Sequence, residues 1–385
     1  MSVKLPDMRP KEPFVAIRTS DRATFKRCRR RWGFNSPLAM HLQPQVKYFG
    51  VVWPLQFGTL IHKCLEEYYD PVLKRDPLEV FRTEWNAFDR EVSREAPDYR
   101  LEHAEEFKEH YELGIGMLKH YKGFAEKHDN FEVIAVEHDF YIPLGFEYKD
   151  KPVYYCGRMD MIKRDLDTGS YGLVDHKTSG RMDEEFFLKL EMDEQCTSYL
   201  WAAQREAEIY DLPYKKLNHI TYNVLRKACI LPPSVLKSGG LSVDRANEST
   251  TAELFEAEIQ KRNLYWWFND NPKAQAYLEW LQEVGESNFF VRENVRRNAH
   301  EIGALGARVE HEAKDMLNAL SAANGKPWDM PYILYPNPTG DWYCKACPFR
   351  APCLAMNDGS DWEGMLEDMY EPSTYGLDLE VHVGG

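Results

Sequence analysis

The sequence Gly157-Arg158-Met159-Asp160 is followed, fifteen residues after its aspartate, by Asp175-His176-Lys177. Alternation of apolar and polar residues around these two motifs predicts neighbouring strands over 153–163 and 171–177. The Asp-Thr-Gly-Ser sequence between the strands is typical of a tight turn. We therefore expect a hairpin whose two aspartates converge on one edge of a sheet.

These carboxylates and the lysine are suited to the hydrolysis of a phosphodiester. Hard divalent cations such as Mg²⁺ and Mn²⁺ prefer carboxylate oxygens, and they can activate water and neutralise charge on a phosphate. Asp160 and Asp175 are the candidate ligands. Residues two apart on a strand share a face, so Lys177 is expected beside the metal. His176 would point the other way and could offer its backbone carbonyl to the metal.

Three flanking features could complete such a site. His62 lies four residues after Gly58 on a predicted helix that starts there. Gln195-x3-Tyr199 places an amide and a phenol on one face of a helix predicted over 186–210. Glu137, on a strand predicted over 131–142, is a candidate outer-shell acid or additional ligand. Taken singly, a histidine such as His62 is more often a hydrogen-bonded helix residue than a metal ligand, and a pair such as Gln195 and Tyr199 more often serves packing.

A second motif, Cys344-x2-Cys347-x5-Cys353, lies near the end of the chain, with Cys28 more than 300 residues upstream. Its short irregular spacing suits a loop that wraps around an inorganic centre, and Cys28 is the best candidate for a fourth ligand. A zinc site with four cysteine ligands is the competing interpretation. The remaining cysteines are expected to be small core residues.

Together these motifs resemble the RecB-like branch of the PD-(D/E)XK nuclease superfamily over residues 55–225. The resemblance implies an α/β fold with a restriction-endonuclease-like core, in which a central mixed sheet is flanked by helices and carries helical insertions. It implies that His62, Asp160 and Asp175 bind Mg²⁺ or Mn²⁺ and that Lys177 is the catalytic lysine. It also implies that Gln195 and Tyr199 line the DNA path.

The one-plus-three cysteine arrangement resembles the nucleases with an iron staple, namely the CRISPR-associated RecB-like nucleases, the AddB nuclease domain and the exonuclease V family. This likeness implies that Cys28, Cys344, Cys347 and Cys353 hold a [4Fe–4S] cluster that ties the two ends of the domain together.

The expected organisation has five parts. They are a basic segment (1–57) with the first cluster cysteine, a nuclease core (58–230) with a helical insert at about 70–128, a helical region (231–327) packed on the core, a cluster segment (328–358) expected to be irregular, and an acidic tail (359–385).

The net charge of −14 is unfavourable for a nucleic-acid enzyme, but the charges are unevenly distributed. Local patches set phosphate attraction. Two basic tracks are therefore candidates for DNA contact, formed by Arg27, Arg29, Arg30 and Arg31 and by Arg292 and Arg296. The aromatic run Tyr265-Trp266-Trp267-Phe268 is expected to be a buried helix face, with stacking on single-stranded bases as the alternative.

No apolar run is long enough to span a bilayer, and the first twenty residues lack the apolar region of a signal peptide. We expect a cytoplasmic protein, in the host cytoplasm if phage-encoded, with reduced cysteines and no membrane partner. The resemblance suggests a 5′→3′ exonuclease acting on single-stranded DNA or DNA ends in phage or bacterial recombination and repair, with a recombinase or single-strand-binding protein as a candidate partner. The alternatives are a CRISPR-adaptation nuclease and a catalytically inactive nucleic-acid-binding or assembly protein.

Overall fold

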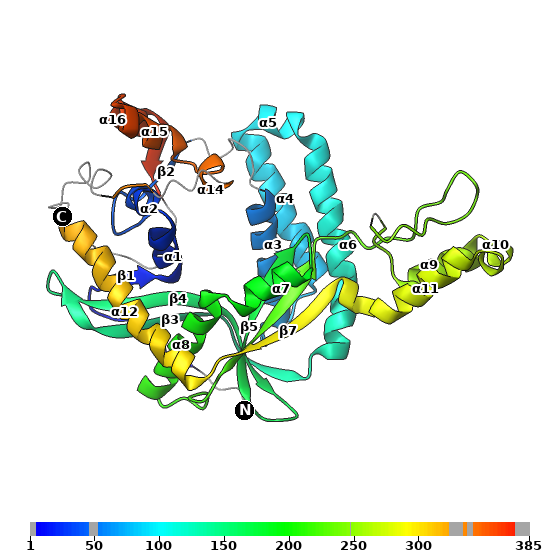
Figure 1. Cartoon of the computed structure of the whole chain (residues 1–385), viewed down its shortest axis with the longest axis horizontal. Coiled ribbons are helices and arrows are strands. Elements are labelled where there is room, and N and C mark those ends of the chain that lie inside the picture. Colours follow the sequence, from blue (N-terminus) through cyan, green and yellow to red (C-terminus); the bar gives the residue numbers. More distant parts are fainter. Residues whose placement is uncertain (1–4, 46–52, 247, 323–333, 337–341, 374–385) are drawn as a thin grey trace.

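A six-stranded mixed sheet forms the centre of the protein (Figure 1). The computed structural model describes residues 5–45, 53–246, 248–322, 334–336 and 342–373. The strands are β1 (Val15–Arg18), β3 (Phe131–Tyr148), β4 (Lys151–Asp165), β5 (Tyr171–Ser179), β6 (His219–Arg226) and β7 (Phe290–Arg296). β1 pairs with β4 and β5 with β6 in parallel, and the other pairs are antiparallel. The predicted fold class, a central mixed sheet flanked by helices, is confirmed.

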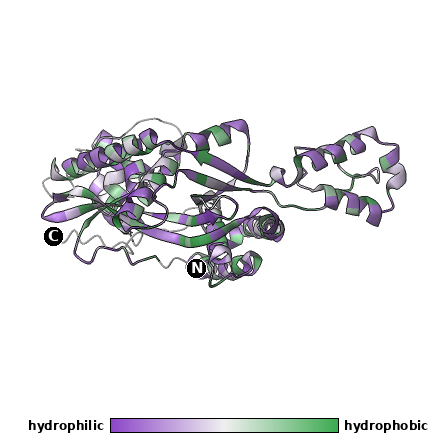
Figure 2. Ribbon diagram, turned by 90° about the horizontal axis from the view of Figure 1, so that it is seen from below, coloured by the Kyte–Doolittle hydropathy of each residue, from purple (hydrophilic) through white to green (hydrophobic). Residues whose placement is uncertain are grey.

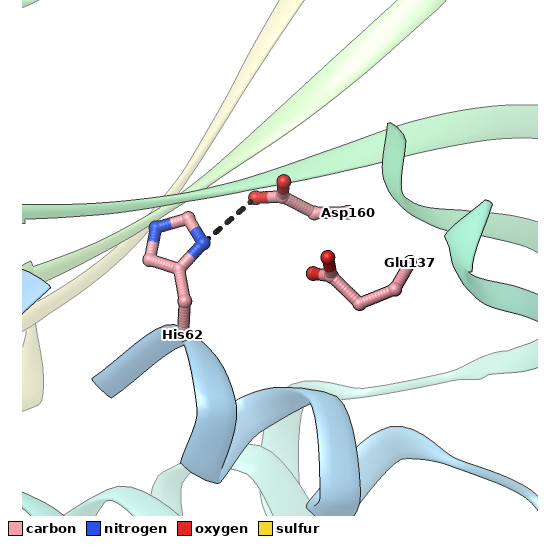
Figure 3. Close-up of side chains that lie close together, drawn as sticks. All are labelled: His62, Glu137 and Asp160. Carbon is pink, nitrogen blue, oxygen red and sulfur yellow. Dashed lines mark ion pairs between the residues drawn. The ribbon is translucent and has the colours of Figure 1, made fainter. Parts of the chain in front are cut away.

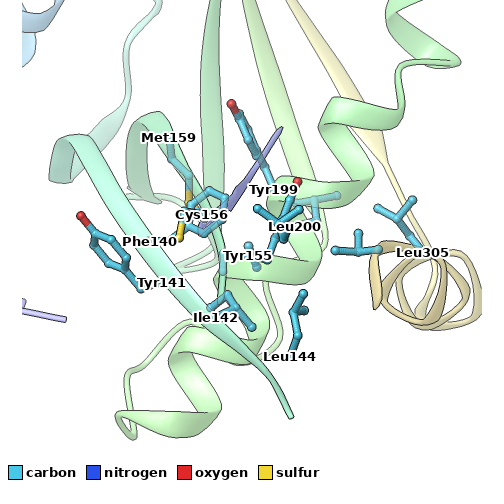
Figure 4. Close-up of a cluster of buried hydrophobic side chains, with 14 of the residues drawn as sticks. Phe140, Tyr141, Ile142, Leu144, Tyr155, Cys156, Met159, Tyr199, Leu200 and Leu305 are labelled. Carbon is cyan, nitrogen blue, oxygen red and sulfur yellow. The ribbon is translucent and has the colours of Figure 1, made fainter. Parts of the chain in front are cut away.

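Each face of the sheet is covered by its own apolar cluster. On one face, α8 (Glu194–Ile209) and α12 (Ala299–Ala322) bury residues such as Leu200 and Leu305 against Phe140 and Tyr155 of the sheet (Figure 4). On the other face, α3 (Trp53–Tyr69) covers Met161. Successive strand residues point to opposite faces, so Met161 and its neighbour Ile162 belong to different clusters.

Three further helices extend the second cluster. They are α4 (Pro77–Glu95), α5 (Pro97–Glu102) and α6 (Ala104–His128), and they occupy the span where the sequence predicts a helical insert. Proline at the first position of α4 and of α5 costs no helix hydrogen bond. Within the described residues, no helix combines the length and the apolar character needed to cross a membrane.

The two chain ends meet in a third, smaller cluster. Phe34 of α2 (Arg29–Asn35) stacks on Phe349, with ring centroids 5.1 Å apart. α14 (Trp342–Lys345), α15 (Arg350–Asp358) and α16 (Trp362–Met369) follow each other there, and β2 (Leu42–Pro44) pairs with β8 (Tyr370–Pro372). The expectation of an irregular cysteine segment is therefore wrong for α15, which carries Cys353.

The expected acidic tail begins inside this cluster. Trp362, Leu366 and Tyr370 are buried in it together with Phe34 and Phe349. Apolar residues at helical spacing outweigh the acidic character of this segment, so α16 and β8 are part of the folded body. The remainder of the predicted tail, residues 374–385, lies outside the described residues.

Residues 252–284 form a projecting helical arm. α9 (Ala252–Lys261), α10 (Tyr265–Asn269) and α11 (Pro272–Val284) bury Phe255, Tyr277 and Leu281 in a cluster of their own. The arm extends away from the sheet in both views (Figures 1 and 2). The expectation that the whole of 231–327 packs on the core is therefore wrong for most of these three helices, whose apolar faces cover one another, although Leu254 at the start of α9 packs against the cluster of the second sheet face.

Candidate metal centre and cysteine pocket

His62 of α3, Glu137 of β3 and Asp160 of β4 come together from three elements (Figure 3). One potential ligand atom from each lies within 4.8 Å of the other two. The Nδ1 atom of His62 is 3.5 Å from Oδ2 of Asp160. An imidazole and two carboxylates converging at this spacing are a donor set suited to Mg²⁺ or Mn²⁺.

Glu137 reaches this site through an irregular backbone. The flanking pairs Val136↔Met161 and His138↔Met159 place it opposite Asp160, but its own φ is +45°. A left-handed conformation is uncommon and unfavourable for a non-glycine residue, and such residues cluster at functional sites. The sequence indicates Glu137 only as a secondary ligand, because a local backbone reversal within a strand leaves no pattern in the sequence.

Burial and neighbouring carboxylates raise the pKa of both carboxyl groups of this site. Burial, followed by the charges of Asp160 and Glu66, raises the pKa of Glu137 to about 7. Burial, followed by the charge of Asp175, raises the pKa of Asp160 to about 6. Like charges held close together in a poorly solvated site disfavour ionisation, and a bound cation would relieve that cost.

Asp175 and Lys177 lie on the same side of β5, next to the three-residue cluster. The Nζ atom of Lys177 is 2.6 Å from Oδ2 of Asp175, which is almost fully buried. The Lys177 ammonium lies 3.4 Å from Oε1 of Gln195, whose amide nitrogen donates to the Tyr199 hydroxyl at 2.9 Å. The structure thus joins the predicted lysine, amide and phenol in one polar chain.

That chain starts where two helices meet. The sequence predicts one helix over 186–210, but α7 (Glu184–Glu191) ends before Asp193, whose side chain caps α8 by accepting from the Gln195 N–H. The first turn of α8 therefore faces β5 directly. Gln195 owes its contact with Lys177 to this cap, which an uninterrupted helical pattern does not reveal.

His176 points to the opposite face, as predicted from the strand period. Its ring is buried, stacks on Tyr69 at 5.7 Å, and is hydrogen-bonded at Nδ1 to the amide nitrogen of Asn223. Burial holds its pKa well below the ordinary value, so the imidazole is neutral. Its backbone N–H donates to Asp160 at 2.7 Å and so fixes that carboxylate.

Arg292 is not available for DNA, contrary to the sequence-based expectation. Its guanidinium donates to Asp129 at 2.8 Å and to the hydroxyls of Tyr69 and Tyr121, and it also contacts Asn223. These partners lie 69 to 223 residues away in the sequence, so a local basic pattern could not identify them. Arg292 therefore ties α3 and α6 to the sheet behind His176. Arg296, the other residue of this predicted track, is exposed.

The four cysteines predicted to act together line one cavity of about 340 Å³. Cys28 interrupts the N-terminal helical segment between α1 (Thr19–Arg27) and α2 with an extended backbone, and its sulfur accepts from the Arg31 N–H. Burial raises the pKa of Cys347, and Cys28 and Cys353 contribute to the same shift. Four cationic side chains also line the cavity: Arg30, Arg31, Lys345 and Arg350.

The other four cysteines lie outside this cavity. Cys64, Cys156 and Cys196 are buried in the apolar clusters, and burial raises the pKa of each thiol. Cys229 is half-buried and its thiol contacts the carbonyl of Glu112. None of these four thiols lines the cavity, so they are not part of the predicted set of sulfur ligands.

The cations of α1 and of the start of α2 are largely neutralised by acidic partners from distant helices. Arg22 is buried and ion-paired with Glu194 and Glu312, and Lys26 lies 2.6 Å from Glu194. Arg29 pairs with Asp315 at 3.3 Å.

The sequence predicts that Arg30 contacts DNA, but in the structure this residue is buried beside the cysteine cavity. Its guanidinium donates to the Cys353 carbonyl at 3.1 Å and to the Asn357 side chain at 2.8 Å. Arg27 is exposed, with its guanidinium 4.1 Å from the centre of the Tyr343 ring, and Arg31 lines the cavity. Arg27 is thus the exposed member of this track, and Arg31 is half-buried at the wall of the cavity.

Comparison with known proteins gives one family. Residues 19–354 match the family described as the PD-(D/E)XK nuclease superfamily, a span that contains both the candidate metal centre and the cysteine cavity. No curated protein matches the chain. Among solved structures, one described as "Crystal structure of SSO0001" is similar with 13% identity and a TM-score of 0.26, over 66% of this chain and 78% of that one.

Proposed function

From the premise that the chain belongs to the PD-(D/E)XK nuclease superfamily, whose members are metal-dependent nucleases acting on nucleic acids, we propose that it is a RecB-like deoxyribonuclease stapled by an iron–sulfur cluster. We further propose that it is an exonuclease on single-stranded DNA or DNA ends, with 5′→3′ polarity, in phage or bacterial recombination and repair. Arg27, Arg31 and Arg296 are its proposed contacts with the DNA backbone.

The observation that carries the catalytic part is the convergence of His62, Glu137 and Asp160 within 4.8 Å, with Asp175 and Lys177 beside them. His62, Glu137 and Asp160 would hold Mg²⁺ or Mn²⁺, with Asp175 as a further carboxylate. A divalent cation bound there would lower the pKa of water and offset charge on the phosphoryl oxygens.

The chain's own residues supply the remaining functions. Burial lowers the pKa of Lys177, but the charges of Asp175 and Asp160 outweigh that effect and raise it, so the side chain stays an ammonium. An ammonium fixed in this position can stabilise negative charge that develops on the scissile phosphate. Gln195, held by Tyr199, orients the lysine from the other side.

The cysteine cavity supports the second part of the proposal. Cys28, Cys344, Cys347 and Cys353 offer four sulfur ligands around one space, and that donor set fits a [4Fe–4S] cluster. A bound cluster would supply a cross-link between segments more than 300 residues apart, and the cations that line the cavity would balance its thiolates. Visible absorbance and iron content of anaerobically purified protein test this directly. Stoichiometric zinc without iron would contradict the iron–sulfur assignment.

A cleavage assay tests the proposed activity. Linear single-stranded, linear duplex and circular single-stranded DNA, end-labelled where an end exists, are incubated with Mg²⁺ or Mn²⁺ and with EDTA. The proposal predicts metal-dependent degradation of linear single strands, sparing of circles, and 5′-proximal products at early times. Cleavage of circles as fast as linear strands would contradict the exonuclease assignment, and an inactive wild type would favour the alternative of a nucleic-acid-binding protein on this fold.

A further inference from the structure

Two large aromatic side chains are exposed on the helical arm. Tyr265 and Trp266 of α10 have 52% and 65% of their surfaces accessible, although the sequence predicts that this run is a buried helix face. Tryptophan is highly buried on average in soluble proteins, and adjacent exposed apolar side chains are a feature of binding surfaces.

The packing of the arm does not require these two side chains. Phe255, Tyr277 and Leu281 make its apolar cluster, against which Trp267 and Phe268 pack as partly buried neighbours. The loop before α9 also closes on Trp267, because a Cβ at Gly240 would lie only 2.4 Å from its indole nitrogen. Trp267 and Phe268 therefore complete the fold of the arm, and Tyr265 and Trp266 face outward without such a role.

Charge is segregated along the arm. α9 runs toward α10 and α11 runs back from it, so the end of α9, α10, the start of α11 and the loop at Gly240 form one tip. The tip carries four cations, Lys237, Lys261, Arg262 and Lys273, against two acids, Glu258 and Asp270. Glu258 pairs with both Lys261 and Arg262, so Lys237 and Lys273 account for most of the excess positive charge. The opposite ends of α9 and α11 carry only acids: Glu253, Glu256, Glu279 and Glu283. In a chain of net charge −14, the tip is thus a positive region that surrounds exposed aromatic rings.

We propose that the arm tip is a second, non-catalytic binding site for single-stranded nucleic acid. Unpaired bases would stack on Tyr265 and Trp266, and Lys237, Lys261 and Lys273 would lie near the phosphates. Stacking on aromatic side chains beside cations is the usual way to bind single strands without sequence preference. A duplex hides the faces of its bases, so the tip is selective for single strands. This inference rests on the proposed nuclease function in taking the bound strand to be the substrate.

The position of the tip predicts a dependence on substrate length. α11 has 13 residues, so the tip projects on the order of 20 Å beyond the sheet. A short oligonucleotide can occupy the metal centre without reaching the arm, whereas a long strand can contact both sites. Simultaneous contact raises the effective concentration of the strand at the metal centre, and this gain appears in KM rather than in kcat.

Two substitutions at Trp266 and one control substitution elsewhere separate stacking from other roles. Trp266→Phe keeps an aromatic face, Trp266→Leu keeps apolar bulk without a stacking surface, and Leu101→Ala is a control at a residue that is 75% exposed on α5. Each variant is assayed on single-stranded oligonucleotides of roughly 8 nucleotides, which is within the usual size of one single-strand site, and of roughly 60 nucleotides, which is well above it. Binding of the longer oligonucleotide and of its duplex is also measured in EDTA by fluorescence anisotropy.

The proposal predicts that Trp266→Leu raises KM for the long strand by about tenfold, while kcat and cleavage of the short one stay unchanged. Trp266→Phe should stay within about twofold of the wild type, Leu101→Ala should match it, and the duplex should bind equally to all forms. Equal KM and equal anisotropy of Trp266→Leu and wild type on the long strand would overturn the proposal and leave the tip to a protein partner. If the wild type binds the long strand through Trp266 but cleaves nothing, the arm site stands and the nuclease proposal fails.

Discussion

The candidate metal centre and the cysteine cavity gather their residues in opposite ways. His62, Glu137 and Asp160 come from elements that all pack on the central sheet, and the carboxylate of Asp160 is fixed by a backbone hydrogen bond within that sheet. The four cysteines come from the two ends of the chain and lie beside a separate small apolar cluster. The first site is built into the core, and the second is assembled at its edge.

Because the two sites are assembled differently, we expect the metal centre to depend little on the cysteine site. The core site is preorganised by the sheet and by the buried network around Arg292, whose partners Tyr69, Tyr121 and Asp129 do not line the cysteine cavity. The edge site is held by contacts between the two chain ends, among them Arg30 to Cys353, the pairing of β2 with β8 and the stack of Phe34 on Phe349. We expect the metal centre to survive the loss of the cluster better than the chain ends do.

The largest effect should come from the core site. Asp160→Asn keeps the size of the side chain but removes the charge of one ligand, so cleavage should fall by about 1,000-fold while the melting temperature is unchanged or higher. Single-turnover cleavage of labelled single-stranded DNA measures the loss. Asp167→Asn, in the exposed turn after β4, is the matched control and should cleave normally. Wild-type turnover in Asp160→Asn would remove this residue from the site.

A smaller effect on cleavage and a larger one on stability are expected from the edge site. Cys28→Ser should lose the iron and melt several degrees lower, because the link between the chain ends is broken. Cys229→Ser, at a half-buried cysteine outside the cavity, is the control and should keep its iron. Below its melting temperature Cys28→Ser should retain more cleavage than Asp160→Asn. A complete loss of cleavage in a folded Cys28→Ser would break the proposed independence of the two sites.

The pH dependence of the thermal stability of the metal-free protein reports how closely the carboxylates are packed at the metal centre. Glu137 and Asp160 have pKa values raised to about 7 and about 6 in the folded protein. Raised values mean that these groups favour folding at low pH and that this stabilisation is lost as the pH rises through about 6 to 7. Glu137→Gln should therefore raise the melting temperature at about pH 8 and change it much less at about pH 5. Thermal melts in EDTA test this, and an equal shift at both pH values would contradict the proposed crowding of charge.

The smallest effect should come from the two basic residues that remain near the cysteine cavity. Replacing Arg27 and Arg31 together by Gln should weaken binding of single-stranded DNA and flatten the slope of log K against log salt by about 1, because fewer counterions are released. Arg94→Gln, at a residue that is 76% exposed on the insert, is the control. A salt slope that stays as steep as that of the wild type would place the DNA path elsewhere.

The sequence predicts the hairpin and its chemistry because both depend on local rules. The strand period of two puts Asp175 and Lys177 on one side and His176 on the other, as the structure has them. The turn between β4 and β5 has residues with the required backbone preferences, and Asp165 accepts the N–H of Thr168 there.

The features that the sequence does not predict depend on distant partners. β1 is only four residues long and gains its place by parallel pairing with β4, about 140 residues later. From the sequence, Arg292 and Arg30 are indistinguishable from surface cations, because their partners Asp129 and Asn357 are distant in the chain. Tyr265 and Trp266 are exposed because the three helices of the arm pack mainly on one another rather than on the core. The helical spacing of apolar residues is the same in both cases, so the sequence does not distinguish them.

Calorimetric titration of the metal-free protein with Mn²⁺ reports the metal centre without relying on cleavage. We expect one site in the wild type, an affinity at least about tenfold weaker in Asp160→Asn and in Glu137→Gln, and wild-type affinity in folded Cys28→Ser. Unchanged Mn²⁺ affinity in both carboxylate variants would contradict the assignment of His62, Glu137 and Asp160 as one cation site.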